Sequence, residues 1–130
     1  MKETIMDDSI LTTIKKMLGI DADYTVFDVD IMVFINAAFM VLAQLGIGDR
    51  EGFKISSADQ TWASFLSDFP DLYESVKTFI YLKVKVLFDP PANSYVMTSY
   101  NNTIDEYAWR LNIEAERRER DAKQRESETV

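Results

Sequence analysis

One segment of the chain, residues 29–45, is apolar on nearly every side of the helix it would form. Of its 17 residues, 14 are apolar, and only Asp30, Asn36 and Gln44 interrupt the run. A surface helix of a small domain carries a single apolar stripe, whereas a helix that is apolar all round needs cover on every side. The segment is shorter than the ~20 residues that cross a bilayer, and acidic residues flank it. We therefore expect a central helix of a protein core and not a membrane span.

The cover for this central helix can come from two sources. The simpler interpretation is that the chain's own helices bury it completely, and the other is that a second subunit supplies part of the cover. Asn36 stands in the middle of the segment, where an amide needs a hydrogen-bond partner and could set the register of the helix. Asn36 is therefore a candidate interface residue.

The spacing of apolar residues predicts five helices and one longer loop. The expected helices cover residues 3–18, 28–45, 60–66, 70–88, and some 30 residues from 94 onward. Asp28 is the predicted N-cap of the second helix, and Pro90 with Pro91 ends the fourth, because proline lacks the backbone donor. The predicted fold class is all-α, a compact bundle of about five helices with a long projecting C-terminal helix and little or no strand.

Residues 46–58 predict the longer loop, because three of the four glycines of the chain fall within them. Phe53 and Ile55 alternate with Lys54, so this part either forms a very short strand or pins the loop through its apolar side chains. Trp62 lies in the short helix that follows and is expected to dock in the core.

The last predicted helix is too long for the body of a domain this size. Its apolar stripe ends near Ile113, and residues 114–128 hold six acidic and five basic side chains. Four acid-first pairs spaced i,i+4 stabilise it by about 0.2–0.5 kcal/mol each. These pairs are Glu114–Arg118, Glu116–Arg120, Glu119–Lys123 and Asp121–Arg125. A helix over residues 94–125 measures about 48 Å, against roughly 35 Å for the whole globule, so it must project.

The chain has 130 residues, which is the size of one domain. Its composition excludes most kinds of catalytic site. The chain has no histidine and no cysteine, so it lacks the commonest general base, thiolate metal ligands and disulfides. With 14 basic and 22 acidic side chains the net charge is −8, which disfavours chain-wide attraction to nucleic acid or anionic membranes. The acidic N-terminal residues are unlike a secretory signal. We expect no enzyme activity, no cofactor and no metal.

Four aspartates in residues 21–30 are the one cluster that suggests a metal site. A calcium loop beginning at Asp21 needs glycine and glutamate where the chain has Val26 and Met32. Helix capping and linker solubility explain these acids better. A divalent-metal hydrolase built on carboxylates remains a third class of function to test.

Two stretches carry a resemblance to a known family. The first leads from residues 25–31 (TVFDVDI) through residues 35–37 (INA) to residues 44–48 (QLGIG). The second is residues 76–91 (VKTFIYLKVKVLFDPP), which ends in Phe-Asp-Pro-Pro. In their order and spacing, over about residues 5–111, they resemble the bacteriophage head–tail connector family, the head-completion adaptors of long-tailed phages and prophages.

The resemblance implies a structural protein of the virion, located at the head–tail junction after synthesis in the host bacterial cytoplasm. It implies a ring of about twelve copies beneath the portal protein, around the DNA channel. A tail-side connector or stopper protein would attach below, and DNA would pass without sequence-specific binding. Residues 1–111 would form the helical connector domain, and residues 112–130 a charged helical extension with a frayed tail.

In this family the C-terminal region often reaches neighbouring subunits, which points to residues 110–125 here. The candidate subunit- or partner-interface residues are Asn36, Arg110, Arg117, Arg118, Arg120, Lys123 and Arg125. Whether a neighbour orders this helix end, or the end frays in solution, stays open at the level of sequence. The alternative from another class is a small helical regulator or assembly chaperone that binds a partner through the charged helix.

Overall fold

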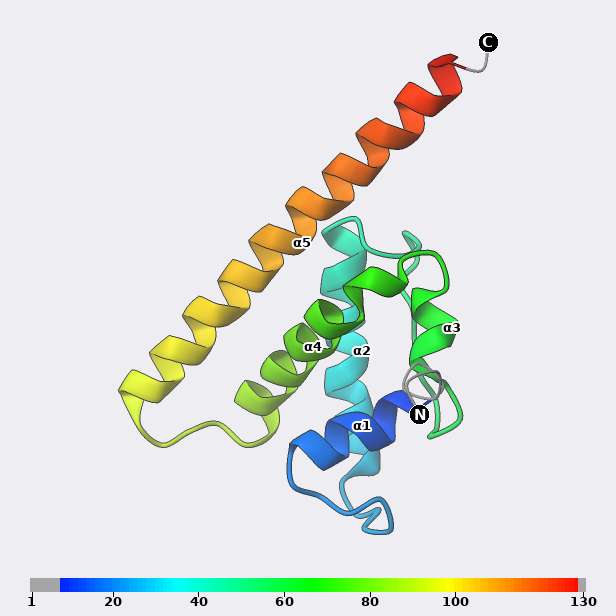
Figure 1. Ribbon diagram of the computed structural model, residues 1–130. Helices are drawn as coiled ribbons and strands as arrows, with labels where there is room; N and C mark the ends of the chain where they lie inside the picture. Colours follow the sequence, from blue (N-terminus) through cyan, green and yellow to red (C-terminus); the bar gives the residue numbers. More distant parts are fainter. Residues whose placement is uncertain (1–7, 129–130) are drawn as a thin grey trace.

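The computed structural model describes residues 8–128, which form a helical bundle and one helix that runs past it (Figure 1). The helices are α1 (Ile10–Met17), α2 (Asp28–Gln44), α3 (Trp62–Leu66), the 3₁₀ turn η2 (Pro70–Leu72), α4 (Tyr73–Phe88) and α5 (Ser94–Glu128). The predicted all-α class with its long C-terminal helix is confirmed, and within residues 8–128 no strand forms beyond one isolated bridge between Ser9 and Thr61.

One face of α2 forms the centre of the core, packed against α4 and α1. The buried residues of this face are Ile31, Ile35, Ala38, Phe39 and Leu42, which recur at helical spacing. The opposite face is apolar too, yet it is exposed, since Val29 and Val33 keep 69% and 59% of their surface in water. The simpler interpretation, that the chain's own helices bury α2 completely, is therefore wrong, because the other described helices cover only one side of it.

The start of the first predicted helix and the cap of the second differ from the structure. The first helix begins at Ile10, because the Ser9 side chain accepts a hydrogen bond from the Thr12 N–H at 3.1 Å and caps it there. Residues 3–7 of the first predicted helix lie outside the part of the chain that the structure describes. In α2 the cap position belongs to Phe27, and Asp28 is the first helical residue. Asp28 is not the cap because its carboxylate binds the Lys15 ammonium at 2.8 Å.

Lys15 is the one charged side chain among the buried residues of the described chain, with 2% of its surface exposed. Its ammonium pairs with Asp28 and also donates a hydrogen bond to the Ala22 carbonyl at 3.0 Å. A buried charge is tolerated only when it is paired and hydrogen-bonded. This group therefore ties α1 to the linker and to the first turn of α2.

The loop of residues 46–58 is pinned and forms no strand. The side-chain amide of Asn36 binds both backbone groups of Ile55. Its nitrogen donates a hydrogen bond to the Ile55 carbonyl at 3.0 Å, and its oxygen accepts one from the Ile55 N–H at 2.8 Å. The Phe53 ring packs against Phe39 and Phe65 at centroid distances of 5.0 and 5.2 Å. Trp62 is fully buried, and its indole N–H donates to the Thr13 hydroxyl at 3.0 Å.

The fold generates a stability prediction for the buried ion pair. Replacing Asp28 with alanine leaves the Lys15 charge buried without its counter-ion, so we expect the free energy of unfolding to fall by about 3 kcal/mol in urea titration. The double change of Lys15→Met with Asp28→Ala should lose clearly less. Asp30→Ala is the matched control, since this exposed first-turn acid contributes only about 0.3–1 kcal/mol through the helix dipole. Equal losses in Asp28→Ala and Asp30→Ala would contradict the assignment.

Candidate assembly surfaces

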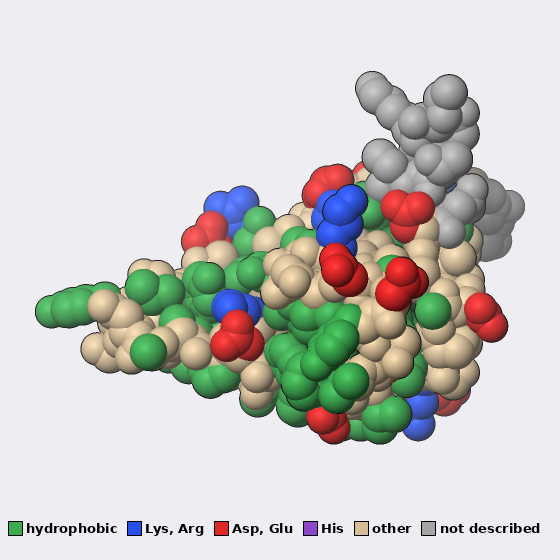
Figure 2. Space-filling view, turned by 90° about the horizontal axis from the view of Figure 1, so that it is seen from below, with side chains coloured by type: hydrophobic (Ala, Val, Ile, Leu, Met, Phe, Trp, Pro, Cys, Tyr) green, Lys and Arg blue, Asp and Glu red, His purple; other side chains and the backbone are tan. Residues whose placement is uncertain are grey.

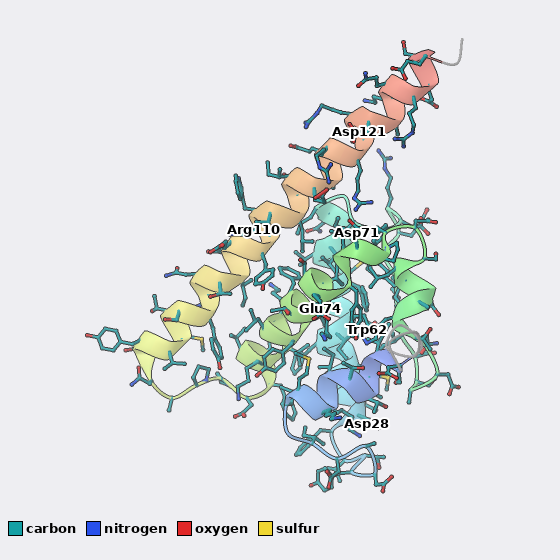
Figure 3. The ribbon with its side chains drawn as sticks, in the orientation of Figure 1. Asp28, Trp62, Asp71, Glu74, Arg110 and Asp121 are labelled. Carbon is teal, nitrogen blue, oxygen red and sulfur yellow. The ribbon has the colours of Figure 1, made fainter. Side chains whose placement is uncertain are left out.

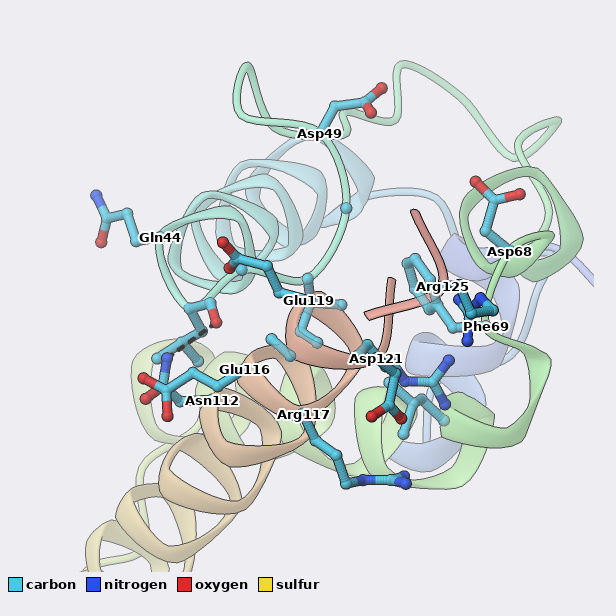
Figure 4. A pocket seen from close by; sticks show the side chains of 17 residues that line it. Gln44, Asp49, Asp68, Phe69, Asn112, Glu116, Arg117, Glu119, Asp121 and Arg125 are labelled. Carbon is cyan, nitrogen blue, oxygen red and sulfur yellow. Dashed lines mark hydrogen bonds between the residues drawn. The ribbon is translucent and has the colours of Figure 1, made fainter. Parts of the chain in front are cut away.

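Where α5 passes the body of the bundle, its residues 112–125 line one side of an open cleft of about 910 Å³ (Figure 4). The body side of the cleft is the turn after α2 and the segment before α4, represented by Leu45, Gly46 and Phe69. The α5 side carries charged residues of both signs, among them Arg118 and Asp121. Three of the predicted interface residues, Arg117, Arg118 and Arg125, line this cleft.

Three contacts hold α5 to the body along this cleft. The Asn112 amide donates a hydrogen bond to the Leu45 carbonyl at 3.1 Å. Ala115 lies so close to Gly46 that a Cβ on that glycine would stand 2.9 Å from the Ala115 Cβ, so glycine is needed there for space as well as for its φ of +94°. Arg118 pairs with Asp71 at 2.5 Å. The first turns of the charged segment are therefore docked, and residues 119–128 beyond them are exposed.

The ion pair at the end of this docked part perturbs the pKa of its carboxyl group. The hydrogen bond from the Arg118 guanidinium lowers the pKa of Asp71 below its ordinary value of 3.8. Arg117 donates a hydrogen bond to Glu114, which raises the pKa of Arg117. Figure 3 shows Asp71 and Glu74 on the side of the bundle that faces α5, with Asp121 farther along the helix.

The structure gives most of the predicted interface residues a partner within the chain. Arg110 pairs with Glu106 at 2.5 Å, Lys123 pairs with Glu119 at 3.1 Å, and Arg125 lines the cleft. Asn36 uses its amide on the loop at Ile55, and Arg120 is exposed. Their role in subunit contact stays a prediction.

Two of the four predicted i,i+4 ion pairs form in the described part of α5. Glu119 binds Lys123, and Glu114 lies 3.8 Å from the Arg118 guanidinium. The Arg118 guanidinium lies near both Glu114 and Asp71. The Glu114 carboxylate also accepts a hydrogen bond from Arg117. The pairs Glu116–Arg120 and Asp121–Arg125 are not formed between residues 8 and 128.

Exposed apolar side chains form a second feature, which the sequence analysis missed. Trp109 and Ile113 lie on the outer face of α5, opposite the stripe of Ile104 and Leu111 that packs on the bundle, and Trp109 keeps 65% of its surface exposed. Their one-turn spacing, out of phase with the buried stripe, is the signal that identifies them. An exposed tryptophan with an aliphatic side chain one turn away is a candidate site of protein contact.

The underside of the molecule carries further hydrophobic side chains, coloured green along the start of α5 and on the body (Figure 2). Tyr24 and Phe27 in the linker before α2 are also exposed, and the Phe27 ring packs edge-on against Phe88 at a centroid distance of 5.3 Å. Among residues 8–128 no group of acidic side chains is arranged to hold a metal ion, and no described helix is long and apolar enough to cross a membrane.

The fold and its surfaces together define a helical protein whose exposed features are those of contact surfaces: a projecting charged helix and uncovered apolar faces. Comparison of the sequence with family models gives a match to the phage connector protein family over residues 10–118. The chain belongs to this family, and it is a structural connector component of a phage particle that interacts with other head and tail proteins. The resemblance noted in the two sequence stretches is confirmed. No curated protein and no solved structure is found to match the chain.

The docked part of α5 generates a pH prediction. Because the pKa of Asp71 is lowered in the folded protein, its ion pair stabilises the docking above pH 3.8 and is lost as the pH falls through the folded-state value. In Arg118→Ala, an NMR titration of the Asp71 carboxyl should give a pKa back near 3.8. Because the Asp71 side chain is 64% exposed, the pair contributes at most about 1 kcal/mol.

Arg120→Ala is the matched control for this titration, because Arg120 lies two residues farther along α5 and is exposed. The Asp71 titration should be unchanged in it. A normal Asp71 pKa in the unaltered protein would contradict the Arg118–Asp71 contact.

Proposed function

We propose that this connector protein forms a ring of about twelve copies beneath the portal protein, around the DNA channel at the head–tail junction of the virion. The ring joins the capsid vertex to a tail-side connector or stopper protein. The observation that carries the proposal is the exposed end of α5, residues 119–128, which extends from the bundle in a member of the connector family.

The charges of the chain fit a structure through which DNA passes. The net charge is −8, and residues 17–49 contain five aspartates and no lysine or arginine. Acidic walls repel the phosphate backbone, so DNA moves along such a channel without sequence-specific binding. The same acids on an outer surface would serve solubility.

We further propose that residues 1–111 act as the connector domain and residues 112–130 as an extension that reaches neighbouring proteins. The contacts of Asn112, Ala115 and Arg118 then hold the extension at a fixed angle to the domain. In this proposal the exposed bases Arg110, Arg117 and Arg120 face other subunits or the portal.

Truncation after Leu111 tests this division of the chain. Since Leu111 and Ile104 remain to cover α4, we expect a folded monomer by circular dichroism and cooperative unfolding, but no stable incorporation at the capsid vertex. Truncation after Arg125 is the matched control, because it keeps all three contacts along the cleft and every candidate interface residue, and it should be incorporated normally. The extension has no role in assembly if particles carry the Leu111 truncation in normal amounts.

Native mass over a wide concentration series tests the ring itself. A closed species of about twelve subunits, or about 180 kDa from chains of 15.0 kDa, is the expected result. A protein that is monomeric alone should form the ring on purified portal. A persistent dimer that is absent from finished particles would instead favour the regulator or assembly chaperone.

A further inference from the structure

The open cleft between α5 and the body of the bundle has an apolar floor. Leu45 and Phe69 are half-buried there, and Ile47 and Leu72 line the cleft from the core. Its volume of about 910 Å³ lies near the upper end of the roughly 300–1,000 Å³ that ligand pockets occupy. Because the cleft is also open to solvent, it fits a segment of protein chain better than an enclosed small molecule.

Both walls of the cleft carry exposed acidic side chains that have no basic partner. Asp49 and Asp68 stand on the body, and Glu116 and Asp121 stand on α5 (Figure 4). Within residues 8–128 none of these four carboxylates forms an ion pair. A positively charged side chain in the cleft therefore meets carboxylates on two sides.

The basic residues of the cleft do not neutralise these acids. Arg117 donates a hydrogen bond to Glu114, and Arg118 pairs with Asp71. Arg125 is the remaining base among the described residues that line the cleft. Four unpaired carboxylates against one guanidinium leave the cleft with an excess of negative charge.

The C-terminal end of α2 adds to this negative potential. Gln44, Leu45 and Gly46 line the cleft, so the carbonyl end of the α2 dipole lies at its edge. The last turn of α2 contains no basic residue that would offset the dipole. The backbone and the side chains thus favour the same kind of ligand, a cation.

The charged segments of the chain itself match the cleft poorly. Residues 114–128 mix six acidic with five basic side chains, and residues 50–54 hold an acid between their two bases. Residues 75–88 contain three lysines and no acid, but they form α4, which packs against α2 and α5. A second copy, with its net charge of −8, would bring further acids to the cleft, so charge complementarity favours a different protein.

We propose that this cleft binds a segment of another protein that carries lysine or arginine side chains beside an apolar residue. The apolar residue packs on Leu45 and Phe69, and the basic side chains reach Asp49 and Asp68 on the body and Asp121 on α5. This assignment rests on the proposed role of the extension in reaching neighbouring proteins, and it does not depend on the number of copies in the ring.

A segment bound between the two walls also has a structural consequence. The contacts between α5 and the body end at Arg118, and residues 119–125 are exposed. A basic segment that bridges Asp68 and Asp121 holds this part of α5 to the body as well. The partner thereby fixes the direction in which the extension points.

Binding of synthetic peptides to the single chain tests the cleft directly. A capped peptide KLKRLK, with basic and apolar side chains, should shift the NMR amide signals of Gly46, Gly48 and Asp68, and it should leave those of Asp21 and Asp23 in place. The peptide KSKRSK keeps the charge but lacks the apolar residues, so it should bind at least about fivefold more weakly. The acidic peptide ELEELE should not bind.

Charge reversal on the body wall tests which carboxylates bind the peptide. Asp49→Lys combined with Asp68→Lys should weaken the binding of KLKRLK at least about tenfold in calorimetric titration. Asp21→Lys combined with Asp23→Lys is the matched control, because it makes the same charge change at two exposed acids of the linker before α2. The control should bind the peptide within about twofold of the unaltered chain. Circular dichroism shows whether each variant is folded.

The same two double variants test the role of the cleft in the particle. The Asp49→Lys, Asp68→Lys chain should be found in mature particles at clearly lower amounts than the unaltered chain, whereas the linker control should be incorporated normally. Normal incorporation of both double variants would show that no protein of the particle needs the cleft, and it would overturn the proposal.

The remaining outcomes separate this inference from the ring. Equal weakening of peptide binding by both double variants would show attraction to overall charge and overturn the cleft, as would amide signals that do not shift. Shifts of the same cleft amides on raising the protein concentration without peptide would assign the cleft to a second copy instead. A ring in native mass without peptide binding would overturn the cleft and leave the ring standing, and peptide binding without a ring would do the reverse.

Discussion

The buried face of α2 must be kept from water, and the other elements are arranged around that requirement. This face packs against α4 and α1, and the loop after α2 returns to close the remaining side through Phe53 and Ile55. Asn36 fixes that return, because one amide satisfies both backbone groups of Ile55. The charged pair of Lys15 with Asp28 then sets where α1 crosses the start of α2.

Much of this fold follows from local sequence signals. Apolar spacing and the two prolines predicted the end of α4 and the start of α5, because those signals act within one turn of helix. Asp28 was misassigned as a cap, since a capping carboxylate and a first-turn carboxylate look alike until the buried Lys15 is placed beside it. The sequence also could not identify Asp71 as the partner of Arg118, because Asp71 is distant in sequence and the competing Glu114 lies one turn away on the same helix.

The exposed surfaces show a different limit of sequence reasoning. The segment that forms α2 is apolar all round, and composition alone could not say which face the chain's own helices would leave uncovered. Burial places the free face at Val29 and Val33 and the free end at residues 119–128. A phage connector protein must bury its own core and still bind other proteins, and in this chain α2 and α5 each combine a buried face with exposed apolar side chains.

α5 is also a lever. Its 35 residues make a rigid rod of about 52 Å, joined to α4 through the short link that holds Pro90 and Pro91. A tilt of about 10° at that link moves the far end by about 9 Å at this length. The contacts of Asn112 and Ala115 lie past the middle of the rod, far from the link, so they oppose the tilt effectively. Small adjustments where the rod meets the body thus become large displacements at its tip.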